Sequence, residues 1–407
     1  MPLRSSLLLE EPGQTPPEVE GFCFSGIQAG IKKNGTLDLG LILADEVVSA
    51  AGVFTQNRVR AAPVAIAEQR IRKGKIRAIL VNSGNANCLT GKDGEKAAKE
   101  STRLLAQAIG SSAEFVVPAS TGVIGVPLPL EAITARTNDL LRAASPKGVF
   151  DFARAILTTD RWPKVAFTTF PAGGMEGTLL GIAKGAGMIH PELGTMLAFA
   201  LTDVGIPPSL LRPILKEAVE GSFNGISVDG DTSTNDAVFV LASGKRCNLG
   251  RNRFLLRNFA QALKEVFQAL AGSIVRDGEG AEHLVTIEVK GSRSDADAKK
   301  AACAIATSLL VKTALHGCEA NWGRILAAAG RSGARFDPMQ VSVRIGGVTV
   351  FQEGTPVGAH AEAQAAEIMK SHEYTIEVSL GRGRGHARYL TCDLGPQYVA
   401  INASYRT

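Results

Sequence analysis

The chain has 407 residues, of which 45% are hydrophobic and 20% are charged, a balance typical of a folded globular protein. Its formal net charge of +5 comes from 44 basic residues scattered among 39 acidic ones, so neither a nucleic-acid partner nor a membrane surface is indicated. The six cysteines lie far apart without a CxxC spacing, and the first twenty residues hold one short apolar run. We therefore expect a reduced, cytoplasmic protein with no signal peptide and no membrane span.

Strands and helices are expected to mix in the first half of the chain. Apolar runs predict strands over residues 37–43, 76–81, 115–117 and 165–169. Residues 95–109 carry apolar side chains at helical spacing, which predicts a helix between the second and third of these strands. The first half is therefore of mixed α and β character.

The second half is expected to begin with helices and to end in strands. Apolar periodicity predicts helices over residues 208–218 and 253–271 and a strand over residues 284–289. The composition then changes, and we place the start of a smaller, sheet-rich domain near residue 285.

Two hairpins are expected in the last hundred residues. Residues 341–345 and 348–351 flank the pair Gly346-Gly347, which is typical of a two-residue hairpin turn. Residues 374–380 are expected to pair with residues 387–392 across the glycine-rich segment GRGRG. This turn also accounts for the densest basic cluster of the chain, which consists of Arg382, Arg384 and Arg388.

A threonine in the middle of the chain is the strongest candidate for a nucleophile. Residues 184–203 read KGAGMIHPELGTMLAFALTD and place Thr195 after a small glycine and before an apolar run. A threonine hydroxyl needs a neighbouring base, and its own α-amino group can serve if the Gly194–Thr195 bond is cut. The simpler alternative is that Gly194 forms a turn and Thr195 caps a helix beginning at Met196.

Nine further motifs occur in a recognisable order along the chain. They are AGIKKNGTLDLGLI (29–42), VFTQNRVRAAPV (53–64), VNSGNAN (81–87), ASTGVIG (119–125), TTDRWPK (158–164), NGISVDGDTSTND (224–236), RDGEGA (276–281), NWGRI (321–325) and NASYRT (402–407). With the segment around Thr195, the chain resembles the ornithine acetyltransferase family, also called the bifunctional glutamate and amino-acid N-acetyltransferases of arginine biosynthesis.

The sequence departs from that family at two places. Glu192, Leu193 and Gly194 stand where the family usually has Asn-Met-Ala before the nucleophile, although Gly194 is still small enough for attack on its carbonyl. Residues 317–320 read GCEA where the family commonly has Gly-Ala-Asp-Pro.

The resemblance implies a fold and a domain organisation. The fold class is α/β (α+β), with an α-β-β-α sandwich as the main domain, assembled from both self-cleavage fragments. Residues 1–194 form the alpha fragment, residues 195–284 complete the main domain, and residues 285–407 form a smaller C-terminal α/β domain whose tail returns to the active site. The resemblance also implies a heterotetramer of two alpha and two beta fragments.

The resemblance further implies a reaction. Thr195 would take the acetyl group of N-acetylornithine as an ester and pass it to glutamate, in a ping-pong reaction without a metal or an organic cofactor. Whether acetyl-CoA also serves as a co-substrate stays open. The Thr121 hydroxyl and the Gly122 N–H would form the oxyanion hole. The implied substrate shell consists of Thr158, Lys184, Thr195, Glu279, Asn402 and Thr407.

The chemistry of this shell suits the substrates. An α-carboxylate matches Lys184, whereas the side-chain ammonium of ornithine needs an acceptor such as Glu279 or the terminal carboxylate of Thr407. Taken singly, each residue has a simpler interpretation: a surface lysine at 184, an exposed turn carboxylate at 279, an unimportant C-terminal residue at 402, and a strand-end turn at residues 120–122.

Two other functions remain open from the sequence. The first is an amino-terminal-nucleophile aminopeptidase or amidase, which would pass the acyl group to water. The second is an uncleaved amino-acid-binding protein. Within the motifs, Asp229, Asp231 and Asp236 resemble a cation loop but lack the glycine and glutamate of a calcium site. His190, five residues before Thr195, is a weaker candidate for catalysis.

Overall fold

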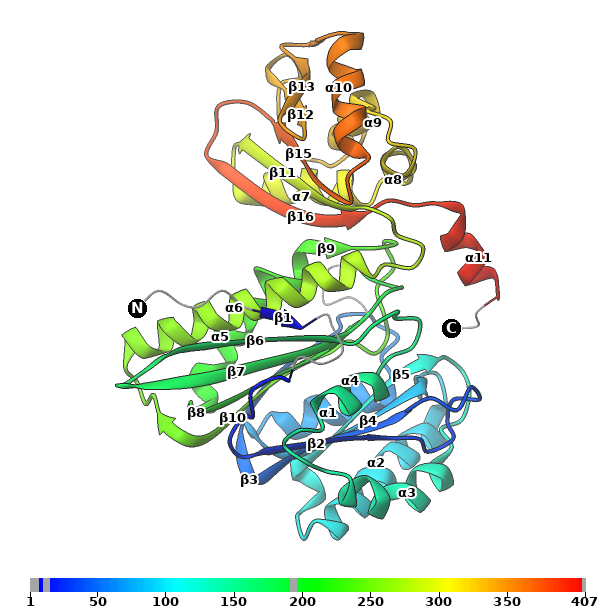
Figure 1. Cartoon of the computed structure of the whole chain (residues 1–407), viewed down its shortest axis with the longest axis vertical. Helices are drawn as coiled ribbons and strands as arrows, with labels where there is room; N and C mark the ends of the chain where they lie inside the picture. The colour runs from blue at the N-terminus through cyan, green and yellow to red at the C-terminus, as the bar shows by residue number, and fades with distance from the viewer. Residues whose placement is uncertain (1–6, 10–14, 191–195, 405–407) are drawn as a thin grey trace.

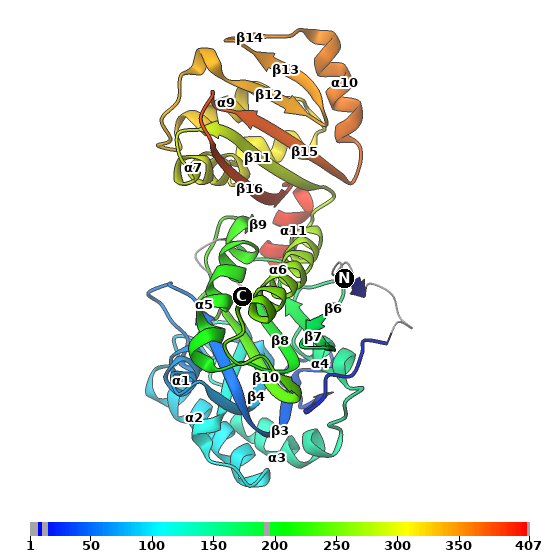
Figure 2. The same cartoon turned by 90° about the vertical axis from the view of Figure 1, so that its left-hand side faces the viewer.

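The computed structural model describes residues 7–9, 15–190 and 196–404. Within these residues, the strands form a larger sheet of nine strands and a smaller sheet of seven. Figure 1 shows the larger sheet with its helices below the smaller one, and Figure 2 shows the same two parts after a quarter turn.

The larger sheet has the strand order β1-β6-β7-β8-β10-β3-β4-β5, and β2 pairs with β3 beside this path. Its strands are β1 (Leu7–Leu9), β2 (Phe22–Ile27), β3 (Leu39–Phe54), β4 (Lys75–Asn85), β5 (Val116–Val123), β6 (Lys164–Ala172), β7 (Met175–Lys184), β8 (Leu197–Gly205) and β10 (Ala237–Asn248). The pairs β8–β10 and β4–β5 are parallel, and the other pairs are antiparallel.

The long strand β3 folds the larger sheet into two layers. Residues 39–44 of β3 pair with β2, and residues 49–54 pair with β10. Apolar side chains of the two layers then meet in one core, where the Phe199 and Phe239 rings stack at 5.7 Å. Phe54 of β3 meets Phe239 edge-on at 5.6 Å.

Helices cover the outer faces of both layers, whereas α4 (Val149–Ala155) packs into the core between them, where Phe152 contacts Phe24 and Phe199 (Figure 1). The helices of this part are α1 (Ala62–Ile71), α2 (Gly91–Ala108), α3 (Leu130–Arg142), α4 (Val149–Ala155), α5 (Pro208–Glu220) and α6 (Arg253–Arg276). Helices α5 and α6 pack on the layer of β6, β7, β8 and β10, while α2 and α3 pack on β3, β4 and β5. The predicted α-β-β-α sandwich is therefore confirmed.

The smaller sheet has the order β14-β13-β12-β15-β11-β16-β9. Its strands are β9 (Ile226–Ser227), β11 (Leu284–Ser292), β12 (Ser342–Ile345), β13 (Val348–Gln352), β14 (Thr355–Pro356), β15 (Glu373–Ser379) and β16 (Gly385–Cys392). It packs against α7 (Asp295–Ala306), α8 (Leu309–His316), α9 (Trp322–Gly330) and α10 (Ala359–Met369) around a separate core. The last helix, α11 (Pro396–Ser404), runs back toward the larger sheet (Figure 1).

Most of the predicted elements are present, and several are longer than their patterns indicated. Strand β3 continues to Phe54, and β5 continues to Val123, so that residues 120–122 belong to a strand. The predicted Gly-Gly hairpin connects β12 and β13, with positive φ at both glycines.

The helix that was the alternative explanation of Thr195 is absent from the described residues, because strand β8 begins at Leu197. All nine residues of β8 are buried, as expected for the central strand of a covered sheet. Residues 191–195 themselves lie outside the described residues.

The predicted pairing of residues 374–380 with residues 387–392 is wrong. Strand β11 lies between them, parallel to β15 and antiparallel to β16. The glycine-rich connection crosses the end of β11, where the Gly383 N–H donates to the Gly291 carbonyl at 2.9 Å. A Cβ at Gly383 would lie 1.9 Å from the Ser292 carbonyl oxygen, so the glycines permit a close crossing rather than a hairpin turn.

Candidate active site

One cavity is lined by side chains from motifs that are spread over the chain. It has a volume of about 170 Å³ and lies where the ends of β5 and β7 meet the loop before β10, the turn after α6 and helix α11. Six predicted site residues line it: Thr121, Gly122, Thr158, Lys184, Glu279 and Asn402. The predicted cleavage bond Gly194–Thr195 and the predicted substrate residue Thr407 lie outside the described residues. A larger groove of about 1070 Å³ lies between α6 and the smaller sheet, and other residues line it.

Lys184, the last residue of β7, is the central polar group of this cavity. It is 3% exposed, and its Nζ donates to Thr158 Oγ1 at 2.7 Å and to Thr121 Oγ1 at 3.2 Å. Burial lowers the pKa of Lys184, because the ammonium loses hydration, while the Asp160 carboxylate 3.7 Å away opposes this shift. The ammonium therefore connects a residue of the predicted substrate shell with a residue of the predicted oxyanion hole.

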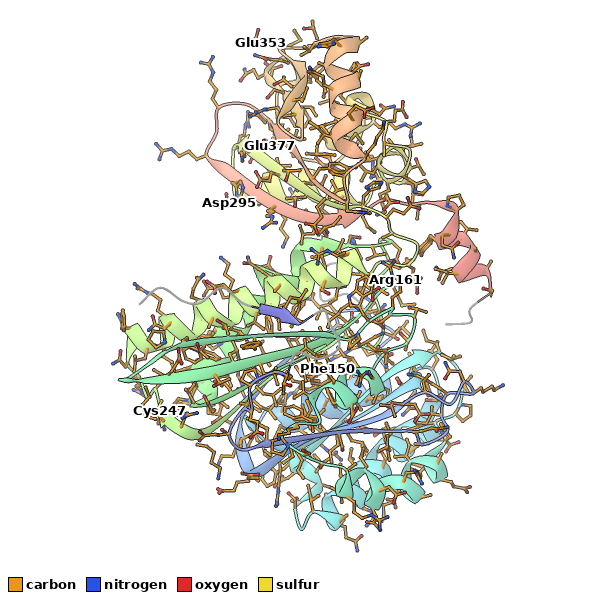
Figure 3. All side chains as sticks on the ribbon, in the orientation of Figure 1. Phe150, Arg161, Cys247, Asp295, Glu353 and Glu377 are labelled. Atoms are coloured by element: carbon orange, nitrogen blue, oxygen red, sulfur yellow. The ribbon has the colours of Figure 1, made fainter. Side chains whose placement is uncertain are left out.

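A buried ion network lies behind Lys184. Lys164 Nζ is 2.8 Å from Asp160 Oδ1 and 2.6 Å from Asp277 Oδ2, and all three side chains are inaccessible to solvent. Burial alone would raise the pKa of Asp160, but Lys164 and Lys184 beside it hold that pKa well below its ordinary value. Arg161 Nε binds Asp277 Oδ1 at 2.9 Å, and Figure 3 shows Arg161 near the boundary between the two sheet-containing parts.

Asp160 also holds the backbone at two places beside the cavity. Its carboxylate accepts the N–H of Thr158 at 3.1 Å and the N–H of Gly185 at 2.6 Å. Asp160 and Lys164 belong to the motif TTDRWPK, but neither was among the predicted site residues. An aspartate and a lysine four residues apart at the start of a strand could have indicated an ion pair. The sequence does not show, however, that both side chains are buried.

The predicted oxyanion residues lie where β5 pairs with the end of β4. Gly122 has a φ of +129°, and a Cβ there would lie 2.4 Å from the Gly84 carbonyl carbon, so a side chain at this position would be strained and would clash. Asn235 joins the two strand ends, because its Nδ2 donates to the carbonyls of Ser120 at 2.8 Å and Ala86 at 2.7 Å. Three separated motifs therefore build this wall together.

The cavity lining also includes the acidic residue Glu279. Its Oε2 accepts a hydrogen bond from Asn402 Nδ2 at 2.7 Å, which ties α11 to the turn after α6. A Cβ at Gly187 would lie 2.5 Å from the Glu279 carboxyl, so glycine at 187 leaves room for it. Lys184 and Glu279 thus place a basic and an acidic group in one cavity.

Two aspartates between β9 and β10 bind the backbone on both sides of residues 191–195. Asp229 accepts the N–H groups of residues 188 and 189, and Asp236 Oδ1 accepts the Met196 N–H at 2.6 Å. This motif resembles a cation loop only weakly. In the structure both carboxylates instead accept hydrogen bonds from backbone N–H groups.

Asp229 is also linked to the last helix. The Tyr398 hydroxyl of α11 donates to Asp229 Oδ2 at 3.4 Å. Burial raises the pKa of Asp229 to about 6, although the N–H groups of Asp231 and Met188 oppose the shift. His190 does not line the cavity, and its Nδ1 lies 3.4 Å from Ser227 Oγ, so a catalytic role for His190 gains no support.

In the part of the chain that the structure describes, no three His, Cys, Asp or Glu side chains gather in a way that could hold a metal ion. No helix in the same part combines the length and the hydrophobicity that crossing a membrane requires. All six cysteines are free thiols.

The ArgJ family model matches residues 23–407 of this chain. The arginine biosynthesis bifunctional protein ArgJ of Geobacter sulfurreducens is 47% identical over 96% of this chain and 100% of its own length. The protein of the same name from Parasynechococcus marenigrum is 44% identical over 100% of this chain and 98% of its own.

Among solved structures, ArgJ of Bacillus halodurans is 40% identical with a TM-score of 0.49, covering 52% of this chain and 100% of that one. The family match and the two relatives extend over nearly the whole sequence and confirm the resemblance that nine separated motifs indicated. The chain therefore belongs to the ArgJ family of acetyltransferases.

Proposed function

We propose that the chain cleaves itself between Gly194 and Thr195 and then moves the acetyl group of N2-acetylornithine to glutamate through an acetyl-Thr195 ester. The main support is that six residues from five separated motifs line one cavity, and that the backbone of Met196, the residue after Thr195, is bound by Asp236 of the same cavity loop. Ornithine and N-acetylglutamate are the products.

The proposed cleavage supplies the base for the later reaction. The Thr195 hydroxyl attacks the Gly194 carbonyl, an ester forms, and water hydrolyses it to leave a free α-amine on Thr195. This amine has a reference pKa of about 7.7 to 8.0, so a useful fraction is neutral near pH 7 and can accept the hydroxyl proton.

Acetyl transfer then occurs in two balanced steps. The Thr195 oxygen bonds to the acetyl carbon, the bond to the ornithine α-nitrogen breaks, and that nitrogen leaves with the proton. The glutamate amine later attacks the ester and returns a proton to the Thr195 oxygen. In both steps the Thr121 hydroxyl and the Gly122 N–H are proposed to stabilise the oxyanion.

The charges of the cavity favour amino-acid substrates. In our proposal Lys184 binds the α-carboxylate that acetylornithine and glutamate share, supported by Thr158, which accepts its hydrogen bond. Glu279, held by Asn402, faces the side-chain ammonium of ornithine. Thr407 supplies its terminal carboxylate as a second acceptor in the same proposal.

A second acetyl donor is part of this proposal. The relatives are named bifunctional proteins, which supports acetyl-CoA as an additional acetyl donor for glutamate. We also propose two copies of each fragment, a cytoplasmic location, no bound cofactor, and the division at residues 194 and 284.

Mass spectrometry of the purified protein tests this function. We expect fragments 1–194 and 195–407 from the wild type, a single uncut and inactive chain from Thr195→Ala, and at least partial cleavage of Thr195→Ser. N-acetylornithine alone should add one acetyl mass to fragment 195–407, and glutamate should remove it.

Two outcomes would favour other functions. An acetyl ester that water discharges as fast as glutamate does would indicate an amidase. A single full-length wild-type chain that binds amino acids without turnover would indicate a binding protein. Normal fragments from Thr195→Ala would show that another protease makes the cut.

A further inference from the structure

Asn235 is a buried amide in the loop before β10, and it lines the cavity. It is 6% exposed, and its Nδ2 donates to the Ser120 carbonyl at 2.8 Å and to the Ala86 carbonyl at 2.7 Å. Its Oδ1 accepts a hydrogen bond from the Thr234 hydroxyl at 2.6 Å. Only the NH2 end of an amide can donate to two carbonyls, so these partners fix the orientation of the Asn235 side chain.

The two carbonyls that Asn235 binds lie beside the proposed oxyanion residues 121–122. The Ser120 carbonyl belongs to the planar peptide group that directly precedes these residues. The Ala86 N–H donates at 3.0 Å to the carbonyl of Val123, which directly follows them. Ala86 is therefore tied to both sides of the oxyanion residues, on one side by its own N–H and on the other through the Asn235 amide.

The sheet alone does not hold this strand end in a regular way. The pairing of β4 and β5 is regular from Ala78 to Gly84 and becomes irregular at Asn85, which pairs with both Thr121 and Val123. An irregularity of this kind locally disrupts the hydrogen-bond ladder between two strands. A side-chain amide thus supplements the ladder at the residues that carry the proposed oxyanion donors.

We infer that Asn235 is a positioning residue for the proposed oxyanion hole: its amide holds the peptide group before Thr121 and thereby aims the donors of residues 121–122. This inference rests on the proposed acetyl transfer, of which the oxyanion hole is a part. The proposed cut places Asn235 on fragment 195–407 and its two carbonyl acceptors on fragment 1–194. The hole therefore needs both fragments, although Asn235 itself exchanges no proton with the substrate.

This role affects the transition state more than the bound substrate. Oxyanion donors stabilise the developing charge when they lie about 3 Å from it, and a displacement of about 1 Å can cost about a hundredfold in rate. Substrate binding depends in our proposal on Lys184 and Glu279, which Asn235 does not contact. Loss of the Asn235 amide should therefore lower kcat and leave the substrate dissociation constant nearly unchanged.

Asn235→Asp is the decisive variant, because aspartate keeps the shape of the side chain and replaces the NH2 group with an oxygen that repels both carbonyls. Asn57→Asp is the matched control. Asn57 Nδ2 donates to the Thr232 carbonyl of the same loop at 2.9 Å, but Asn57 is not among the residues that line the cavity. Both variants therefore remove an amide donor from this loop and add the same charge.

We expect matured Asn235→Asp to lose about tenfold to a hundredfold in kcat, with the substrate dissociation constant changed less than about twofold. Asn57→Asp should keep the wild-type kcat. In a Thr121→Ala background, Asn235→Asp should cost less than about threefold further, because one of the donors that it positions is already gone. Wild-type kcat of matured Asn235→Asp, or full additivity with Thr121→Ala, would overturn the inference.

Hydrogen exchange tests a variant that does not mature. In the uncut Thr195→Ala chain, Asn235→Asp should speed amide exchange of residues 119–125 by about tenfold or more, because this strand end loses its support. Asn57→Asp in the same chain should leave these amides unchanged. Equal exchange in the Asn235 variant and its parent, or the same acceleration by Asn57→Asp, would count against the inference.

Failure of the proposed function gives a different result. If the matured wild type transfers no acetyl group to glutamate, or if Thr121→Ala turns over normally, the proposed reaction or its oxyanion hole is wrong, and the inference is wrong with it. If Thr121→Ala is slow and matured Asn235→Asp is as fast as the wild type, only the role of Asn235 is refuted.

Discussion

At the scale of single residues, Lys184 lies between the proposed substrate shell and the proposed oxyanion hole. Its ammonium donates to Thr158 and Thr121 from a buried position, so a substrate carboxylate bound to Lys184, as we propose, would lie next to the proposed oxyanion hole. The Asp160–Lys164–Asp277 network behind it keeps this ammonium in place. Breaking a buried pair of this kind typically costs about 3 to 5 kcal/mol, which makes the network a structural requirement of the site.

Thr121 should act on a charge that exists only in the transition state. We predict that Thr121→Ala lowers kcat by about a hundredfold to a thousandfold and leaves the substrate dissociation constant nearly unchanged. Thr121→Ser, which keeps the hydroxyl that Lys184 contacts, should retain most of the activity.

The comparison uses matured protein, with kcat from initial rates and affinity from calorimetry. Normal turnover of matured Thr121→Ala would remove Thr121 from the oxyanion hole. A loss of substrate affinity with unchanged kcat would assign Thr121 to substrate binding instead.

At the scale of elements, the loop between β9 and β10 connects the two sheets with the cavity. Strand β9 is an edge strand of the smaller sheet, and β10 is a central strand of the larger one. The loop between them supplies Asp229 and Asp236, which bind the backbone on both sides of residues 191–195. Its position therefore depends on both sheets.

Asp229 should make the stability of this loop depend on pH. Its folded pKa of about 6 exceeds the reference value of 3.8, so between about pH 4 and pH 6 the folded protein binds more protons than the unfolded chain. The free energy of unfolding that Asp229 contributes therefore falls as pH rises through this window. The fall is at most about 3 kcal/mol.

Urea unfolding of the uncut Thr195→Ala chain at several pH values measures this effect. We then compare this chain with one that also carries Asp229→Asn. The free energy of unfolding of the double variant, relative to that of Thr195→Ala, should increase progressively from pH 4 to pH 6. Asp93→Asn, which removes an exposed carboxylate from α2 that is not among the groups acting on Asp229, is the control and should show no such trend. A constant difference between the Asp229 variant and its parent would contradict the prediction.

At the scale of the whole molecule, the proposed cut falls between two neighbouring central strands. Strand β7 precedes residue 194 and β8 follows it, and the two pair over six residues. Strands β8 and β10 of the second fragment lie between β7 and β3 of the first. The fragments share one sheet and one apolar core.

We predict that the two fragments stay together after cleavage. They should elute as one species in gel filtration and separate only when the protein is denatured, because separation would break the β7–β8 and β3–β10 pairs and expose the core. The uncut Thr195→Ala protein should elute at the same volume. Elution of a free fragment without denaturant would show that the shared sheet does not hold the fragments together.

The sequence by itself determined the local elements and the family. Apolar periodicity located helices α5 and α6 and the strands β4 and β6, and the Gly346-Gly347 pair located a hairpin, because these patterns reflect dihedral preferences of neighbouring residues. Nine motifs in order were enough to indicate an acetyltransferase of arginine biosynthesis.

The tertiary structure alone decided which strands pair and which charges are buried. The insertion of β11 between β15 and β16, and the addition of β9 to the smaller sheet, join segments far apart in the chain. The burial of Asp160 and Asp236 follows from such joins. Local periodicity carries no information on strand order, because pairing and desolvation depend on contacts between residues distant in sequence.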